Sequence, residues 1–595
     1  MGVVGRQKQP QSIGEDRSPG LSRRDLLQRG ALLGAGVLAA PLLAACGGGS
    51  TVGLTATSAS ASTQPAATSG SGSGSTSGTG GTSATPETSA SASPSAEQTS
   101  GQPKKGGTLK WYLPDDPPDL DPQMQTTSSL QWVLGMCYNG LLRYNVGPGN
   151  GPESEAAATP VPDLALKYEN VDELTYVFHL RQGVKFHDGT DLTAEDVAFS
   201  LNRIRTDSPE FQRAYAFAPV DSVEATTPDS VTIKLKEPYA ALINEIAAAY
   251  TRIAPKHVID EKGDMKQVIV GTGPFKLKSY QRGQQMVLER NDDYFEPDIP
   301  YLDSIEIAIM PDNSSQLAAF NSHAIDIYQP ANSSQLDTMK KVNPDIVVTE
   351  YAPMGLNGIG CNTQVKPFDD VRVRQALWYA IDQQKIIDIV YAGHGSKQRA
   401  VPATYAGWVV PYDQLPMSDA PNIDKAKALL KEAGYENGFK VKCKSVYRYS
   451  QKEATVAAQL FKAIGVDMEI VDMEYGAFLT ARNNGDFDLI AFALAPFGDI
   501  SDFTAALYGT QASRNYGHWG DADLDALLEK GDKELDVDKR KAIYADIQKM
   551  LAEKCWVIDF PEDKLFDAVH PYVKGFVSAQ NPERGLGFWH VWLDK

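Results

Sequence analysis

The side chains best suited to catalysis or metal binding are present in this sequence, but not at the spacings that such chemistry uses. The eight histidines lie at positions 179, 187, 257, 323, 394, 518, 570 and 590, and no two of them are four residues apart. The sequence contains no Gly-x-Ser-x-Gly nucleophile turn and no His-Glu-x-x-His pair. A triad assembled from distant residues would leave no such motif, so this absence argues against an enzyme without excluding one. We expect a protein that is not an enzyme and that uses neither a metal nor a cofactor.

Two kinds of motif look functional at first but favour structural roles. Gly271-Thr272-Gly273-Pro274 has the glycines of a phosphate-binding loop, yet its proline lacks the backbone N–H that such a loop presents, so we expect a structural turn. Acid pairs such as Asp369-Asp370 stand directly before helical patterns, where a carboxylate caps the first backbone N–H groups.

One cysteine, Cys46, has a context that predicts covalent chemistry. Residues 22–27 read Ser-Arg-Arg-Asp-Leu-Leu, a twin-arginine pattern, and an uncharged run of 16 residues follows from Gly30 to Ala45. This run is shorter than the ~20 residues of a membrane span. It ends in Leu-Ala-Ala-Cys, the pattern of a bacterial lipoprotein signal. We expect residues 1–46 to direct export, by the twin-arginine or the general route, and Cys46 to carry the lipid.

Composition separates a tether from a folded body in this chain of 595 residues. In residues 47–105, 50 of the 59 residues are Ser, Thr, Gly, Ala or Pro, and no aromatic residue occurs before residue 106. Such a segment cannot bury enough apolar surface to fold, so we expect a disordered tether that spans roughly 40–45 Å. The body would then stand at the outer face of the cytoplasmic membrane, in the periplasmic or cell-wall space.

The body carries the negative charge of the chain. The net charge is −19; residues 1–46 hold six Lys and Arg against three Asp and Glu, and residues 47–105 hold two of each sign, which leaves −22 for residues 106–595. This charge argues against nucleic acid as a partner and against electrostatic attraction to anionic lipid. We expect a monomeric body that contacts the membrane only through the lipid on Cys46.

Four further cysteines, Cys137, Cys361, Cys443 and Cys555, form no Cys-x-x-Cys motif. An exported protein can hold disulfides, and Cys361 and Cys443 both lie in strand-like runs. The sequence leaves open whether these two are paired or all four are buried free thiols.

Strand and helix patterns alternate along the body. Alternation of apolar residues predicts strands at 174–180 and 231–235 and a hairpin at 275–278 and 286–288. Helical spacing follows Thr193, a capping-box start, as well as Asp370 and either Asn422 or Asp424, and it returns between residues 524 and 551. This order predicts α/β lobes rather than a sandwich or a helical bundle.

Several of these stretches together resemble family 5 of the extracellular solute-binding proteins, the peptide and nickel receptors of ABC importers. The resemblance rests on stretches that begin at residues 119 (Asp-Leu-Asp-Pro), 138 (Tyr-Asn-Gly-Leu), 183 (Gly-Val-Lys-Phe-His-Asp-Gly-Thr), 271 (Gly-Thr-Gly-Pro-Phe), 290 (Arg-Asn-Asp-Asp-Tyr-Phe), 367 (Pro-Phe-Asp-Asp-Val-Arg-Val-Arg-Gln-Ala-Leu) and 424 (Asp-Lys-Ala-Lys-Ala-Leu-Leu-Lys-Glu-Ala-Gly-Tyr). One such match would be weak, but the ordered set is specific.

The resemblance implies an α/β fold that is two-lobed and periplasmic-binding-protein-like, of the hinge-closing class II type, with an extra domain on the N-terminal lobe. Lobe I would comprise residues 106–144, 266–354 and 562–595. The extra domain would comprise residues 145–265, and lobe II residues 355–561.

The resemblance also implies a function. A small ligand, an oligopeptide or dipeptide in most relatives, would bind between the lobes, favour the closed state and be delivered to an ABC permease. The ligand could instead be an oligosaccharide, an opine-like conjugate or a nickel chelate. From another class, a surface-anchored hydrolase would need a nucleophile and base in the cleft, which the sequence does not offer. We expect an inter-lobe cavity of several hundred Å³.

The residues expected at the ligand follow from the same resemblance. In peptide-binding relatives an aspartate after a Trp-containing strand pairs with the ligand amine; here Asp499 aligns best with it and Asp502 second, although the Trp itself is absent and the loop is shorter. The other candidates are Trp408, Tyr405, Asn362, Trp132, Tyr138 and Phe497. Each could equally be a packing or capping residue.

Overall fold

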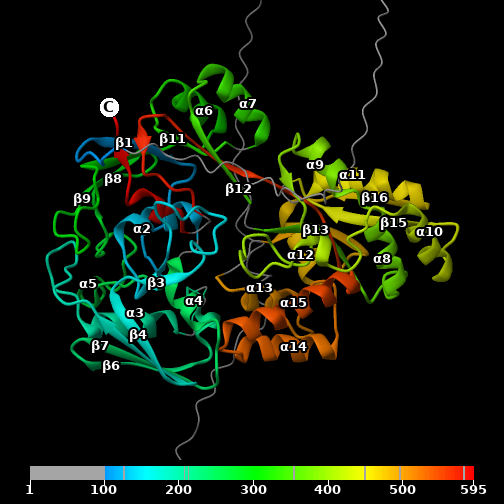
Figure 1. The fold of residues 1–595 in the computed structure, drawn as a ribbon, viewed down its shortest axis with the longest axis horizontal. Helices are drawn as coiled ribbons and strands as arrows, with labels where there is room; N and C mark the ends of the chain where they lie inside the picture. The colour runs from blue at the N-terminus through cyan, green and yellow to red at the C-terminus, as the bar shows by residue number, and fades with distance from the viewer. Residues whose placement is uncertain are drawn as a thin grey trace, which may run out of the picture. The chain divides into compact units, whose positions relative to one another are not determined.

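The computed structural model describes residues 101–595, apart from residues 125, 126, 207, 209, 212, 331, 353, 354, 448, 449, 495–497 and 580–582. The expected lipid attachment site Cys46 and the candidate Phe497 therefore lie outside the described residues, as do the export signal and most of the tether. Within the described part, no helix combines the length and the apolar character that crossing a membrane requires. Strands and helices alternate along this part of the chain (Figure 1).

A four-stranded sheet unites the start of the body with a segment almost 200 residues later. Its order is β1 (Thr108–Leu113), β10 (Ser304–Ile309), β9 (Gln285–Arg290) and β8 (Phe275–Gln281), with β1 parallel to β10 and the other pairs antiparallel. The expected hairpin is thus confirmed as β8 and β9. The helices of this region are α2 (Ser128–Cys137), α6 (Asn313–Asn321) and α7 (Ser333–Val342).

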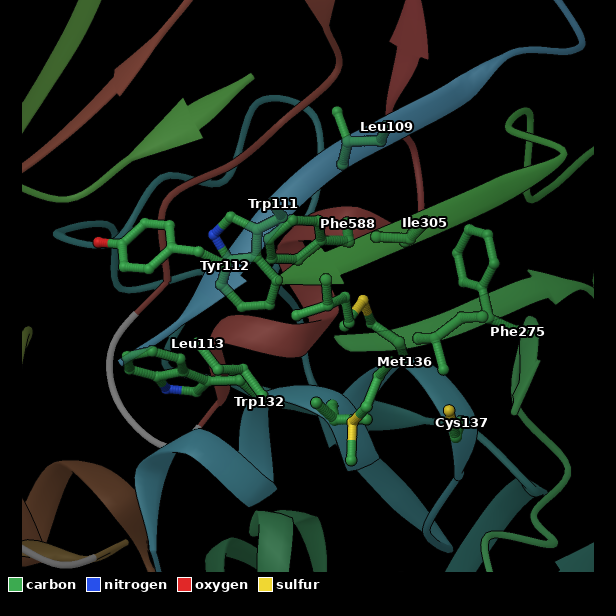
Figure 2. Close-up of a cluster of buried hydrophobic side chains, with 14 of the residues drawn as sticks. Leu109, Trp111, Tyr112, Leu113, Trp132, Met136, Cys137, Phe275, Ile305 and Phe588 are labelled. Carbon is green, nitrogen blue, oxygen red and sulfur yellow. The ribbon is translucent and has the colours of Figure 1, made fainter. Parts of the chain in front are cut away.

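The core beside this sheet also includes the last residues of the chain. Trp111 on β1 lies 4.4 Å from Phe588 and 5.9 Å from Trp132 on α2, measured between ring centroids. Figure 2 shows these rings together with Leu113 and Met136. Short strands β21 (Val573–Lys574) and β22 (Trp592–Leu593) hold the tail in an antiparallel pair.

A second four-stranded sheet, all antiparallel, has the order β4 (Ala165–Asp172), β5 (Thr175–Leu180), β7 (Ser230–Leu235) and β6 (Val220–Thr227). Phe178 and Val231 are buried, which explains the period-two pattern of β5 and β7. Helix α3 (Ala194–Ile204) begins with the expected capping box: Thr193 accepts from the N–H of Asp196, and the Asp196 carboxylate accepts from the N–H of Thr193. Helices α4 (Leu242–Ala247) and α5 (Lys256–Lys262) follow, and β2 (Leu142–Tyr144) pairs with β3 (Pro160–Pro162).

A five-stranded mixed sheet forms the other large unit, in the order β16 (Val466–Asp472), β15 (Phe439–Ser445), β17 (Leu489–Leu494), β13 (Leu356–Cys361) and β18 (Val557–Asp559). Its helices are α8 (Val371–Ala380), α9 (Gln383–Val390), α10 (Ile423–Glu432), α11 (Gln451–Phe461) and α12 (Tyr475–Asn483). Asp370 caps α8, as the sequence predicts, and of the two candidates for α10 it is Asn422 that caps the helix, with Asp424 in its first turn. Helices α13 (Ile500–Tyr508), α14 (Ala522–Lys533) and α15 (Val537–Lys554) come after β17.

Two crossings connect the five-stranded sheet to a three-stranded sheet, β11 (Ile327–Tyr328), β20 (Leu565–Val569) and β12 (Val347–Tyr351). The chain passes from β12 into β13, and it returns from β18 through β19 (Glu562–Asp563), which pairs with β14 (Gly395–Ser396), into β20. A hinge between two lobes is typically formed by a few such connecting segments that lie next to one another.

The four described cysteines are free and buried. Cys361 on β13 and Cys443 on β15 both pair with Leu489 of β17, which lies between them. Because neighbouring strands lie about 4.8 Å apart, their Cα atoms are separated by about 10 Å, and a disulfide needs less than about 7 Å. The structure therefore shows four free thiols rather than a disulfide between Cys361 and Cys443.

Candidate functional site

Asp499, the foremost candidate for the ligand amine, is buried at the start of α13. It caps this helix, since its Oδ1 accepts from the N–H of Ser501 at 2.8 Å. Arg540 on α15 binds both carboxylate oxygens, Nη2 to Oδ1 at 2.6 Å and Nη1 to Oδ2 at 3.0 Å. Asn244 on α4 donates to Oδ2 at 2.5 Å. Both oxygens of Asp499 are thus occupied by groups of the protein itself.

The electrostatics of Asp499 agree with this pairing. Burial would raise the pKa of the carboxyl, but the charge and hydrogen bonds of Arg540 outweigh it, so the pKa of Asp499 lies below its ordinary value. The same pair raises the pKa of Arg540. A charged, bidentate pair of this kind is well suited to holding α13 on α15.

Asp502, the second candidate, lies one turn further along α13 and faces another arginine. Arg213 donates from Nη2 to Oδ2 of Asp502 at 3.1 Å and to Oε2 of Glu245 at 2.8 Å. Burial raises the pKa of Asp502, and Arg213 offsets the shift only in part. Arg213 therefore joins α13 to α4, as the hydrogen bond from Asn244 to Asp499 also does.

Tyr144 completes the contact at the end of β2. Its hydroxyl lies 3.2 Å from the carbonyl oxygen of Gly498 and 3.3 Å from that of Asn244, so it can donate to either. The start of α13 and the residue before it thus contact the end of β2, α4 and Arg213. The residues involved are 498, 499 and 502 on one side and 144, 213, 244 and 245 on the other.

The two aromatic candidates of the Pro/Gly-rich stretch lie near Asp499, Tyr405 buried and Trp408 half-buried. Tyr405 is buried and packs on Phe503 of α13, with ring centroids 6.0 Å apart. The guanidinium of Arg540 lies 5.1 Å from the ring centroid of Trp408, which also packs edge-on against Tyr544. Asp499, Asp502, Tyr405 and Trp408 are therefore brought together around α13.

The remaining described candidates lie elsewhere. The amide of Asn362 donates to the carbonyls of Gly485 and Phe487 and fixes that loop. Trp132 packs in the core of the first sheet, with the guanidinium of Arg584 over its ring at 5.5 Å. Tyr138 is buried, and its hydroxyl accepts from the N–H of Val270.

A pocket of about 700 Å³ lies beside the hinge connections. It is lined by the start of α7, the end of α9, the start of α11 and residues 562–565, together with residues 357, 447 and 493. Its volume is in the range expected for a ligand pocket. Two of the carboxyls that line it are Glu562, which is buried, and Asp563, which is half-buried: desolvation raises the pKa of Glu562 well above its ordinary value and that of Asp563 to about 7. Within the described part of the chain, no group of three or more His, Cys, Asp and Glu is placed to hold a metal ion.

Sequence reasoning missed the partners of the two aspartates. Arg540 follows Asp499 by 41 residues, and Asn244 precedes it by 255. A signal for Arg540 does exist, since it occupies the buried face of α15 with Ile543, Tyr544 and Ile547, and a charged residue in an apolar stripe needs a partner. Nothing local marks Arg213, Asn244 or Tyr144.

Comparisons with known proteins cover nearly all of the described body. The family model of bacterial extracellular solute-binding proteins, family 5, matches residues 159–516. The dipeptide-binding protein of Escherichia coli K12 is 28% identical over 508 residues, which is 79% of this chain and 92% of that protein.

Solved structures agree in fold. The periplasmic binding protein DppA from Helicobacter pylori, in complex with the peptide STSA, is 25% identical, with a TM-score of 0.66, and the match covers 83% of this chain and 99% of that one. The binding protein AgaA from A. tumefaciens R10, in complex with agropinic acid, is 26% identical, with a TM-score of 0.65 over 82% and 99% of the two chains. The two-lobed α/β fold expected from the sequence is thereby confirmed.

Proposed function

Because the chain belongs to the bacterial extracellular solute-binding proteins of family 5, we propose that it captures a small solute between two lobes and delivers it to the permease of an ABC importer. The observation that carries this proposal is the extent of the likeness: the relatives match over most of their length and include peptide-binding proteins. A ligand that contacts both lobes stabilises the closed form by its differential affinity, and the two connections beside β13 and β18 allow that motion.

An oligopeptide or dipeptide is the first candidate ligand, because the relatives include dipeptide-, di/tripeptide- and oligopeptide-binding proteins. The test is mass spectrometry of solutes that copurify with the protein, followed by a thermal-shift screen with the solutes found. A true ligand at 100 times its Kd should stabilise the native state by about 2.7 kcal/mol. Copurified solutes that leave the melting temperature unchanged would contradict the assignment.

An opine-like conjugate is a second candidate, and one observation favours it. The carboxylate of Asp499 is already held by Arg540 and Asn244, so a free peptide amine would have to displace a bidentate pair. A conjugate without a primary amine avoids that competition, and AgaA, whose structure contains agropinic acid, has the same fold. Comparing agropinic acid with unmodified dipeptides in the same thermal-shift screen separates the two candidates.

For the proposed receptor we keep the lobe boundaries expected from the sequence as part of the proposal, and the ligand would border α13 near Asp499, Asp502, Tyr405 and Trp408. Closure would bring residues 145–265 onto α13, a role that the contacts from Arg213 and Asn244 support, and Tyr144 at the end of lobe I makes a further contact there.

Attachment to the outer face of the cytoplasmic membrane through a lipid on Cys46 is the remaining part of the proposal. The twin-arginine pattern, the apolar run and the Leu-Ala-Ala-Cys ending support it. In cells that make the protein, the wild type should partition into the detergent phase and Cys46→Ala into the aqueous phase. Equal partitioning of the two would remove the lipid from the proposal.

A further inference from the structure

The second of the two hinge connections carries a pair of carboxyls, Glu562 and Asp563, which form β19. Glu562 is 2% exposed, and Gln398, with its amide nitrogen turned toward this carboxyl, donates to Oε2 at 3.1 Å. The Oδ1 atom of Asp563 is buried and has no hydrogen-bond partner among the described residues. Because β19 lies between β18 and β20, both acids stand on the segment about which the lobes would turn.

A third acid, Glu453 at the start of α11, faces the same pocket. It is 8% exposed, and its Oε1 accepts from the hydroxyl of Tyr391 at 2.7 Å. Glu453, Glu562 and Asp563, which we call the hinge carboxyls, all line the pocket of about 700 Å³ beside the hinge connections. Within the part of the chain that the structure describes, none of the three forms an ion pair.

The other charged groups around this pocket come from several elements: Glu350 on β12, Asp388 on α9, His394 before β14, Lys452 on α11, and Lys564 with its partner Glu153. Nδ1 of His394 lies 3.3 Å from Oε2 of Glu350, and Nζ of Lys564 lies 3.0 Å from Oε1 of Glu153. Two of the cations are thus engaged with other acids. Burial outweighs the attraction of His394 and Lys452, and Glu453 adds repulsion, so the pKa of Asp563 rises to about 7.

The walls of the pocket come from both sides of the hinge. The start of α7 precedes the first connection along the chain, whereas α9 and α11 lie between the two connections. Oγ of Ser333 donates to the carbonyl oxygen of Tyr391 at 3.0 Å and so joins α7 to α9. A hinge motion that parts these helices would admit water to the pocket, and solvated hinge carboxyls would return to their ordinary, lower pKa values.

We propose that the hinge carboxyls form a proton-sensitive switch: the closed arrangement takes up a proton at this pocket, so the lobes close more readily in acidic than in neutral surroundings. The inference rests on the proposed function, since it concerns the closure that captures the solute. Its sign follows from Asp563, whose pKa is about 7 when buried and 3.8 when solvated. The contribution to closure is complete below the lower value and is lost as the pH rises through about 7.

An isosteric variant removes this titration. In Asp563→Asn the amide imitates the protonated carboxyl, and the double variant Glu562→Gln/Asp563→Asn does the same for both acids of β19. Asp163→Asn is the matched control: burial raises the pKa of Asp163 to about 7 as well, but this residue binds Asn139 and Gly140, which follow α2, and does not line the pocket. Circular dichroism verifies the fold of each protein.

Small-angle X-ray scattering of the solute-free proteins at pH 5.5 and pH 8 measures the switch without knowledge of the solute. In the wild type and in Asp163→Asn, the ratio of closed to open molecules should fall roughly tenfold or more between these pH values, with an increase in the radius of gyration. Asp563→Asn and the double variant should keep the smaller radius at both.

A radius of the wild type that does not change with pH, or one that decreases as the pH rises, would overturn the inference. The same pH response in Asp563→Asn and in the wild type would overturn it too. Neither result touches the proposed function, because the thermal-shift screen with copurified solutes at a single pH does not depend on the switch.

Discussion

Arg540 is the residue on which the burial of Asp499 depends. Both side chains are almost fully buried, and Arg540 also donates from Nε to the carbonyl of Gly531. A buried ion pair adds little compared with apolar residues of the same volume, but removing one partner leaves an uncompensated charge. The pair therefore makes α13 and α15 sensitive to single substitutions.

Arg540→Met should lower the free energy of unfolding by about 3–5 kcal/mol, because Asp499 would remain buried and unpaired. Lys549→Met on the same helix is the control: its pair with Asp546 is exposed on both sides, so the change should stay below about 1 kcal/mol. Urea denaturation of the three proteins measures both effects, and similar losses in the two variants would contradict the role given to Arg540.

Asp559 on β18 should make stability depend on pH. Burial raises its pKa from 3.8 to about 6, against the opposing charge of Arg399. The folded state thus binds this proton more tightly than the unfolded state, so the carboxyl stabilises the fold most at low pH, and that contribution is lost as the pH rises from about 4 to about 6.

The variant Asp559→Asn lacks this titration. Relative to it, the wild type should lose up to about 2–3 kcal/mol of stability between pH 4 and pH 7. Melting temperatures of both proteins across this range provide the measurement. Parallel curves would show that Asp559 is ionised in both the folded and the unfolded state.

At the residue scale, the sequence predicts what is local. The caps Thr193 and Asp370, and Asn422 as one of two candidates, could be predicted because a capping residue and its N–H partners lie within four positions of one another. The paired charges around Glu245 could not be predicted, since they come from four separate stretches of the chain and only folding brings them together.

At the scale of elements, the turn after residue 270 illustrates how a glycine motif can be structural. A Cβ on Gly273 would lie 2.4 Å from the carbonyl carbon of Cys137 and 2.7 Å from the backbone nitrogen of Tyr138. The end of α2 therefore packs directly on the turn, which confirms a structural role for Gly271-Thr272-Gly273-Pro274.

Gly273→Ala should destabilise the protein by about 3 kcal/mol or more, since neither neighbour is a side chain that can move aside. Gly283→Ala is the matched control in the β8–β9 turn: its φ is +71°, but a Cβ there meets no atom within 4 Å, so only the cost of about 1–2 kcal/mol for a left-handed alanine is expected. Thermal melts of both variants measure the two losses of stability. A larger loss in Gly283→Ala than in Gly273→Ala would refute the packing argument.

Individual strands could be predicted, but their order in the sheets could not. The patterns at residues 174–180 and 231–235 correspond to β5, which buries every second residue, and to β7, which is buried at all positions but Lys234. The order β16-β15-β17-β13-β18 combines strands separated by up to 200 residues, and alternation within a strand carries no information about its neighbours. The resemblance to a family supplied the two lobes and the segments that build them, but not this strand order.

At the scale of the whole molecule, two kinds of contact join residues 145–265 to the helices after β17. Exposed ion pairs link Glu155 to Lys541 and Glu237 to Lys533, at 2.5 and 3.2 Å. The pair of Arg213 and Asp502 is buried instead. Since solvent and salt screen exposed pairs, the buried contact should contribute more to the closed arrangement.

Asp502→Asn should therefore increase the radius of gyration of the ligand-free protein, measured by small-angle X-ray scattering, as open molecules become more populated. The double variant Glu155→Gln/Glu237→Gln should change it less at 0.15 M salt. A larger change in the double variant would assign closure to the exposed pairs.

The shared core of Trp111 and Phe588 has a consequence for biosynthesis. The ribosome adds about 5–20 residues per second, so roughly 25–95 seconds pass between the synthesis of β1 and that of its partner in the tail. During that time Trp111 and Trp132, both buried in the finished protein, lack the ring that covers them. The nascent chain therefore exposes an apolar aromatic surface until translation is almost complete. Chains truncated before residue 588 should aggregate.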